Sequence, residues 1–377
     1  MDFSLTVEQK TIQEMAQDFV AHELRPFSEE WDRTAYFTRE ALKAAAALGF
    51  GSLYIAEKYG GCGLSREDGF LVFEALAQGC VSTPAFLSIH NMTSWILDQY
   101  GSEAQCHKWL RPMISMEKFS SYCLTEPHAG SDAASLRSRA IKSGDFYVLN
   151  GEKCFISGGG QSDYYFCIVR TSDHRIKGLS CFLVEKGTPG LSFGPPARKM
   201  GWRNQPTTTV SFSNCKVPID NLIGKEGEGF NIAMEALNGG RLNIAACALG
   251  GARESLRLAK KYMEEREQFG KKLTQFQVLQ FRYVDAVTQL EAARLLGIKA
   301  AYAMDQKEHN LRAACAMAKR FATDTAFQVS NEALQFLGGY GYLQEYHIER
   351  IVRALRVMQI LEGTNEVMRI VMARDML

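Results

Sequence analysis

The apolar positions of the first 120 residues repeat with the period of an α-helix. In LTVEQKTIQEMAQDFVAHEL they fall on one helical face, and Thr6 and Gln9 have the spacing of a capping box. The runs REALKAAAALGF and EDGFLVFEALAQG repeat the pattern, and a glycine suited to a helix C-terminus stands at or just before the end of each. The pattern predicts an N-terminal α-helical domain over residues 1–120.

Residues 121–232 have a different pattern, with short β-rich runs separated by turn residues. FYVLNGEKCFIS, DYYFCIVRT and TTTVSFSNCKVP are three of these runs. The pair Asn150-Gly151 interrupts the first of them and predicts a hairpin turn at that point. Strands at this spacing predict a middle domain that is a small β-sandwich or barrel.

Residues 233–377 are again helical in pattern, now in longer segments. Helices are predicted over 233–265, 275–303 and 312–337, with a shorter one after Thr364. Helices of this length pack most readily as an antiparallel four-helix bundle. The predicted fold class is therefore α+β multidomain, with helical, β and helical domains in that order.

Composition excludes several classes of partner. The 377 residues carry 43 basic and 42 acidic side chains, and a net charge of +1 predicts neither a nucleic-acid nor a membrane partner. The ten cysteines and seven histidines show no metal-ligand spacing, so no metal site is predicted. The opening MDFSLTVEQK resembles neither a signal peptide nor a transit segment. We therefore expect a cytoplasmic protein of bacterial type, with a processed protein of the mitochondrial matrix as the alternative.

Three loops carry candidate chemistry. YCLTEPHAGSDAAS has hydroxyls and bends that suit contact with a polar ring or a phosphate, although a strand-entry turn is the plain alternative. Arg266 lies where a long helix ends, and its guanidinium suits a phosphate, but an arginine there, taken alone, is more often a solvated helix-end charge. QFLGGYGY is a glycine-rich turn that admits a ligand close to the backbone, or simply ends a helix.

Glu362 is the candidate catalytic residue. It follows the apolar run VMQIL, and burial at the end of that run would raise the pKa of its carboxyl toward neutrality. A carboxylate with a raised pKa suits a general base that removes a weakly acidic proton. Thr364 then has the position of a cap for a short helix. A helix-end surface charge is the plain alternative for Glu362 taken alone.

Taken together, the motifs resemble the acyl-CoA dehydrogenases along essentially the whole chain. YCLTEPHAGSDA, FIS, LNGGR, REQFG, QFLGGYGY and LEGTNE occur in the order and spacing of that family. GCGLSR, SIHNM, MEKFSSYCLTEP and LNGGR are most similar to the branch that acts on short branched-chain acyl-CoA thioesters. The resemblance implies a homotetramer that binds FAD between its middle and C-terminal domains and passes electrons to electron-transfer flavoprotein.

The resemblance also implies the site residues. The segment that would line the flavin ring comprises Tyr122, Cys123, Leu124, Thr125, Glu126, Pro127, Gly130 and Ser131, together with Phe155, Ile156 and Ser157. Those that would reach the FAD of a neighbouring subunit are Arg266, Phe276, Gln277, Gln335, Phe336, Leu337, Gly338 and Gly339. Thr364, Asn365 and Glu366 would complete the cofactor site, and Ser131, Asn238, Gly239, Gly240, Arg241 and Arg374 would hold the acyl-CoA.

By the same resemblance, Glu362 is the base that removes the α proton of the thioester while a hydride leaves the β carbon. One branch of the family carries its base on the earlier helix, but the matching position here is Gly240, which has no side chain. The chain departs from the family pattern at His128, where many relatives have glycine, and in KKLTQFQ, which replaces a proline-bearing version. The alternatives are a dehydrogenase of butyryl- or 2-methylbutyryl-CoA, and a non-catalytic protein that binds flavin or acyl-CoA.

Overall fold

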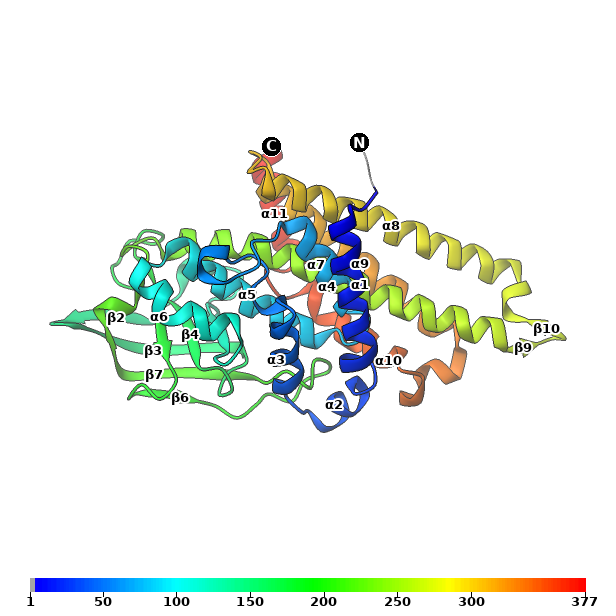
Figure 1. Ribbon diagram of the computed structural model, residues 1–377, viewed down its shortest axis with the longest axis horizontal. Helices are drawn as coiled ribbons and strands as arrows, with labels where there is room; N and C mark the ends of the chain where they lie inside the picture. The colour runs from blue at the N-terminus through cyan, green and yellow to red at the C-terminus, as the bar shows by residue number, and fades with distance from the viewer. Residues whose placement is uncertain (1–3) are drawn as a thin grey trace.

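The computed structural model describes residues 4–377, and its first part is helical as predicted (Figure 1). The helices are α1 (Val7–Phe19), α2 (Ser28–Thr34), α3 (Arg39–Ala47), α4 (Arg66–Leu76), α5 (Ser82–Tyr100) and α6 (Glu103–Ile114). The predicted capping box is confirmed, because Gln9 N–H donates to Thr6 Oγ1 and Thr6 N–H donates to Gln9 Oε1, both at 3.2 Å. α4 and α5 are buried along most of their length and pack on the long helix α7 (Gly229–Glu265).

A single curved sheet forms the middle of the chain. Its strands are β1 (Ser120–Cys123), β2 (Arg139–Ser143), β3 (Phe146–Ser157), β4 (Tyr164–Arg170), β5 (Leu179–Glu185), β6 (Leu191–Phe193), β7 (Thr207–Pro218) and β8 (Leu222–Ile223). The order is β6-β7-β3-β2-β4-β5-β8, and β1 pairs in parallel with β4. β4 is buried at every position, and β5 at all but its last, which fits their central place in the domain.

The hairpin predicted at Asn150-Gly151 is wrong. Both residues lie inside β3, and the turn comes earlier, between Ser143 and Phe146. Gly151 has φ +137° and stands where the register between β3 and β7 shifts. The glycine therefore serves a β-bulge, and the pairing of β3 with β7 along its length overrides the local turn signal.

The C-terminal part contains the predicted long helices. They are α7, α8 (Gln277–Asp305) and α9 (Leu311–Phe336), followed by α10 (Ile348–Arg356) and α11 (Asn365–Met376). α7 begins at Gly229, four residues before the predicted start. α7 runs away from the sheet to the small hairpin of β9 (Glu267–Gln268) and β10 (Lys271–Lys272), and α8 runs back from that hairpin (Figure 1).

Two absences hold for residues 4–377. No helix there combines the length and the apolar character needed to cross a membrane. Nor do three acidic, histidine or cysteine side chains of these residues gather into a cluster that could ligate a metal.

Candidate active site

Glu362 lies in the turn between a 3₁₀ turn, Val357–Gln359, and α11. Its φ of +54° is in the left-handed region, and Gly363 follows at +90°. A residue with a side chain is held in that region at a cost of about 1–3 kcal/mol, so the surrounding structure must impose it. The strain therefore points to a turn whose shape serves the side chain at its apex.

Two buried cations from the helical bundle hold this turn. Arg241 in α7 donates from Nε to the main-chain oxygen of Glu362 at 3.2 Å. Lys319 in α9 donates from Nζ to the main-chain oxygen of Gly363 and to Asn365 Oδ1, both at 2.9 Å. Both side chains are buried, and each satisfies groups that the turn would otherwise leave without a partner.

Sequence reasoning missed Lys319. Its side chain is 0% exposed although lysine is rarely fully buried without a partner. The one available signal was its place inside the apolar helical run ACAMAKRFA. That pattern does not separate a buried lysine from one on the solvated face of a helix. Burial lowers the pKa of the Lys319 ammonium to about 8, and the negative charge of Glu362 works against that shift.

The Glu362 carboxyl is poised for proton transfer. Burial raises its pKa to about 7, although the charges of Arg241 and Lys319 pull it down. The raised pKa expected from the sequence is thus confirmed. Its Oε2 is buried and has no hydrogen-bond partner within residues 4–377. A buried carboxylate oxygen without a hydrogen-bond partner costs free energy in a folded protein. Its presence here therefore indicates a catalytic or ligand-binding role.

Gly240 faces the same point as Glu362. A Cβ added at Gly240 would lie 2.3 Å from Glu362 Oε2 and 2.9 Å from its carboxyl carbon. The absence of a side chain on α7 therefore makes room for the carboxylate. Neighbouring Arg241 and Asn238 are also buried, and Arg241 Nη1 donates to Asn238 Oδ1 at 2.9 Å.

The segment 122–131 brings a second unpartnered polar atom toward the site. The Tyr122 hydroxyl is buried and makes no hydrogen bond within residues 4–377. Burial raises the pKa of this phenol well above its usual range, and the nearby charge of Glu362 raises it further. β1 and the Glu362 turn are thereby brought together by the fold, as the resemblance implied.

The side chain of Glu126 takes a different direction. It is buried in the β domain, where its carboxylate accepts from Lys153 Nζ at 2.7 Å and from the main-chain N–H of Ser138 at 3.0 Å. Cys123 is buried as well, whereas Pro127, Gly130 and Ser131 are exposed. Glu126 therefore fixes the shape of the loop through its ion pair, and the loop's main chain and exposed residues form its outer surface. His128, the departure from the family pattern, lies 3.3 Å from the same carboxylate.

Phe155, Ile156 and Ser157 lie at the end of β3. Phe155 has φ +57° and lies within a register shift between β3 and β7. The bulge turns its ring outward, so that the side chain is 76% exposed. Cys154 N–H donates to the Thr125 main-chain oxygen at 2.9 Å, which ties this strand to the segment 122–131. An exposed aromatic ring beside a hydroxyl-bearing loop offers a surface for a planar heteroaromatic group.

A second group of predicted residues lies at the opposite end of the molecule (Figure 1). Arg266 ends α7, its guanidinium carbon is 5.7 Å from the Tyr340 ring, and Gln335–Gly339 follow at the end of α9. Phe276 and Gln277 lie at the start of α8, beside the β9–β10 hairpin. One chain therefore does not bring these residues to the segment 122–131.

The last predicted residues lie around α11. Thr364 caps this helix by accepting from Val367 N–H at 3.3 Å, and Glu366 is exposed in its first turn. Asn365 is turned inward to Lys319, Thr323 and Asp324. Arg374 is exposed near the C-terminal end of the helix.

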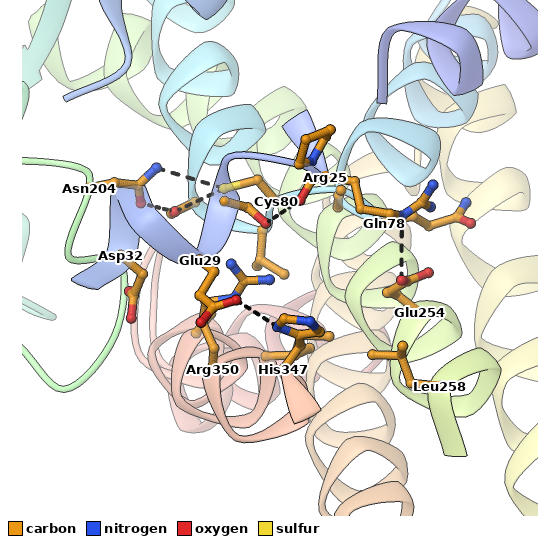
Figure 2. Close-up of a pocket in the computed structure, with 18 of the residues that line it drawn as sticks. Arg25, Glu29, Asp32, Gln78, Cys80, Asn204, Glu254, Leu258, His347 and Arg350 are labelled. Atoms are coloured by element: carbon orange, nitrogen blue, oxygen red, sulfur yellow. Dashed lines mark hydrogen bonds and ion pairs between the residues drawn. The ribbon is translucent and has the colours of Figure 1, made fainter. Parts of the chain in front are cut away.

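A cavity of about 500 Å³ lies elsewhere, among α2, the start of α5, α7 and α10 (Figure 2). It is lined by charges of both signs, for example Glu29 and His347, which face each other at 3.3 Å. None of the site residues predicted from the sequence lines it. The chemistry of the Glu362 turn, rather than the size of this hollow, therefore identifies the candidate active site.

Three family models match the chain in order. The acyl-CoA dehydrogenase N-terminal domain matches residues 6–117, the middle domain residues 121–215 and the C-terminal domain residues 227–377. The chain belongs to the acyl-CoA dehydrogenase family. Isobutyryl-CoA dehydrogenase, mitochondrial, of Dictyostelium discoideum is 52% identical over 99% of this chain and 90% of its own length. The protein of the same name from Bos taurus is 51% identical with the same coverage.

Solved structures agree with this assignment. Butyryl-CoA dehydrogenase from Megasphaera elsdenii has a TM-score of 0.97 at 38% identity, covering 100% of this chain and 99% of its own. A chain from a study of the electron transferring flavoprotein of Acidaminococcus fermentans has a TM-score of 0.98 at 41% identity, covering 100% of both. The FAD complex of PigA has a TM-score of 0.96 at 30% identity, covering 100% of this chain and 99% of the PigA chain.

Members of this family are FAD-dependent oxidoreductases that act on CH–CH bonds, and this acyl-CoA dehydrogenase is one of them. Its residues fit the cofactor. Phe155 presents an exposed ring, Tyr122 has a buried hydroxyl without a partner in residues 4–377, and a Cβ added at Gly130 would meet nothing within 4 Å. A flat ring system with polar edges suits such a surface.

The buried ammonium of Lys319 predicts a pH effect. Its positive charge favours ionised Glu362, so Lys319→Met should raise the pKa of Glu362. Because a base acts only when ionised, the rising limb of kcat/KM against pH should move upward by about 1 unit. Lys260→Met is the control, since Lys260 is exposed and paired with Glu264 on the surface of α7. An unchanged limb in an FAD-loaded Lys319→Met variant would show that Lys319 does not act on the carboxyl.

Proposed function

We propose that the protein dehydrogenates a short branched-chain acyl-CoA between its α and β carbons, converting isobutyryl-CoA to methacrylyl-CoA as in valine degradation. The observation that carries the proposal is the Glu362 carboxyl, buried, with a pKa of about 7 and an Oε2 that has no partner within residues 4–377. Near pH 7 a large share of this group is ionised, yet it is basic enough to accept a proton from carbon. The names of the two curated relatives reported above support the choice of acyl group.

In this mechanism Glu362 removes the α proton onto a carboxylate oxygen, and the electron pair of that C–H bond becomes the new double bond. Bound FAD supplies the acceptor for the hydride that leaves the β carbon. The main-chain N–H of Glu362 makes no hydrogen bond within residues 4–377, so it is free to donate to the thioester oxygen. That donation would stabilise the negative charge that develops on the oxygen as the α proton leaves.

The roles of the remaining residues follow from their places. Tyr122–Ser131 and Phe155–Ser157 would hold the flavin ring, and Thr364–Glu366 would border it from the start of α11. Asn238–Arg241 would lie along the acyl thioester, because Gly240 faces Glu362 directly. Ser131 and Arg374, both exposed, would contact the outer part of acyl-CoA.

Oligomer formation is part of the proposal. The site residues fall into two groups at opposite ends of one chain, and a neighbouring subunit would bring the Arg266 group to the flavin (Figure 1). Helix α8 also exposes apolar side chains at helical spacing, namely Val278, Phe281, Val284, Leu295 and Tyr302. An exposed apolar stripe of this length is typical of a protein interface, so it supports an oligomer, and the number of four subunits rests on the family resemblance.

The electron acceptor proposed is electron-transfer flavoprotein, as the family resemblance implies. The likeness to a chain solved in work on the electron transferring flavoprotein of Acidaminococcus fermentans supports this choice. The compartment remains a prediction from the sequence: the cytoplasm, or the mitochondrial matrix that the names of the two curated relatives suggest. A dehydrogenase of butyryl- or 2-methylbutyryl-CoA is the second candidate, favoured by the likeness to butyryl-CoA dehydrogenase.

Replacement of the base tests the mechanism. Glu362→Gln keeps the volume of the side chain, so the fold and the FAD content should survive, but the amide cannot accept the α proton. Bleaching of the flavin by isobutyryl-CoA in stopped flow should slow by about 10²–10⁴-fold. Glu14→Gln is the matched control, because Glu14 is an exposed glutamate on α1 with no place in the proposed site. Near wild-type bleaching by Glu362→Gln would exclude this residue as the base.

A substrate panel tests the acyl group. With an artificial electron acceptor, kcat/KM for isobutyryl-CoA should exceed that for octanoyl-CoA. Overlap with butyryl-CoA is expected, because the two acyl groups are isomers that differ only in the position of one methyl group. Even a whole extra methylene in an apolar pocket changes kcat/KM by only about 10–200-fold. A higher kcat/KM for octanoyl-CoA would contradict the proposed substrate.

A further inference from the structure

A third buried cation lies against α7, one residue before the glycine that faces Glu362, and the mechanism does not use it. Arg66 is the first residue of α4 and is 8% exposed. A Cβ added at Gly239 would lie 2.5 Å from Arg66 Nη1, as one added at Gly240 would lie 2.3 Å from Glu362 Oε2. Because Gly239 and Gly240 are consecutive, the guanidinium and the carboxylate approach α7 at neighbouring points.

The guanidinium of Arg66 has aromatic neighbours in place of an acidic one. Its carbon lies 3.7 Å from the centre of the Tyr54 ring and 5.6 Å from that of Trp95 in α5. Within residues 4–377 no carboxylate comes within 4.0 Å of its nitrogens. Asp305, the acid at the end of α8, binds the main-chain N–H of Arg66 at 2.9 Å instead. Cation–π contacts thus replace the ion pair that a buried arginine usually has.

The surrounding contacts fix the position of this side chain. Asp305 anchors the start of α4 by binding the main-chain N–H of Arg66. The Tyr54 ring, against which the Arg66 guanidinium packs, is fixed in turn because the Tyr54 hydroxyl donates to Asn243 Oδ1 in α7 at 2.7 Å. A Cβ added at Gly69 would lie 2.1 Å from the Tyr54 hydroxyl, so α4 packs directly against that ring. The guanidinium is therefore fixed between Tyr54, Trp95 of α5 and Gly239 of α7.

Arg66 lies in the buried interior, against Gly239 of α7. Gly239, Gly240 and Arg66 are all buried, whereas the CoA end of a substrate must lead out to solvent. An acyl chain whose α carbon meets Glu362 would therefore point its tail toward Arg66. A short branched chain would end near the guanidinium. A longer alkyl tail would pack against this charged group, and that contact is unfavourable because the guanidinium has no carboxylate to compensate for the loss of water.

We propose that Arg66 sets the acyl-chain length, its guanidinium closing the acyl end of the site above Gly239. The inference rests on the proposed function, because it assumes that the α carbon lies at Glu362. It makes Arg66 a specificity-determining residue rather than a catalytic one. The sequence contained this residue in GCGLSR, but an arginine at the start of a helix has the pattern of a solvated charge.

The test compares variants at one position across a series of acyl-CoA lengths. Arg66→Met keeps most of the volume and the apolar stem but removes the charge, and Arg66→Lys keeps the charge. With isobutyryl-, butyryl-, hexanoyl- and octanoyl-CoA, Arg66→Met should raise the octanoyl-to-isobutyryl ratio of kcat/KM by about 10-fold or more, and Arg66→Lys should keep the short-chain preference. Arg39→Met is the control, since Arg39 also stacks on an aromatic ring, 4.3 Å from Phe119, away from Gly239.

The outcomes separate the inference from the function beneath it. If the wild-type flavin is bleached by no acyl-CoA, the proposed function fails. If isobutyryl-CoA bleaches the wild type and FAD-loaded Arg66→Met keeps the wild-type length profile, the inference alone is overturned. An equal change in Arg39→Met overturns it as well. The inference is also overturned if the wild type prefers glutaryl-CoA and Arg66→Met abolishes that preference. Arg66 would then bind the second carboxylate of the substrate instead of limiting the length of the acyl chain.

Discussion

The structure of the site depends on one constraint: a glutamate is kept in a left-handed turn by cations that come from other helices. Arg241 binds the main-chain oxygen of Glu362 and Lys319 binds that of Gly363, so α7 and α9 fix the apex of the turn from two sides. The same two charges temper the effect of burial on the carboxyl and leave its pKa at about 7. Geometry and basicity are thus set by the same residues, and loss of either cation would change both.

The helical bundle has a second role, which is to leave space where the chemistry needs it. Gly239 and Gly240 interrupt the side-chain surface of α7, and the Arg66 guanidinium and the Glu362 carboxylate occupy the two gaps. In the proposed site the β domain would contribute the other wall, through Tyr122 and the exposed Phe155 ring. The long helices carry Arg266 and Gln335–Gly339 to the opposite end, which is why the proposed cofactor site requires more than one chain (Figure 1).

The sequence predicted what depends on short-range pattern. The helical segments, the capping box of Thr6 and Gln9 and the rise in the pKa of Glu362 follow from periodicity and from a carboxyl after an apolar run. The hairpin at Asn150-Gly151 failed because pairing of β3 with β7, distant in the sequence, decides the local conformation. Lys319 and Arg66 were not identified because a cation in a helical segment has the same pattern whether it is solvated or buried against a turn.

Moving the base from Glu362 to position 240 tests this account most directly. In Glu362→Gly the turn keeps its left-handed conformation without strain and the space beside Gly240 is vacated, so a carboxylate can be supplied from α7 by Gly240→Glu. Gly240→Gln in the same background controls for volume. We expect isobutyryl-CoA to bleach the FAD-loaded double variant with Gly240→Glu at least about 10-fold faster than Glu362→Gly or the Gln control. Equal rates in all three would contradict the claim that the two positions serve the same reacting carbon.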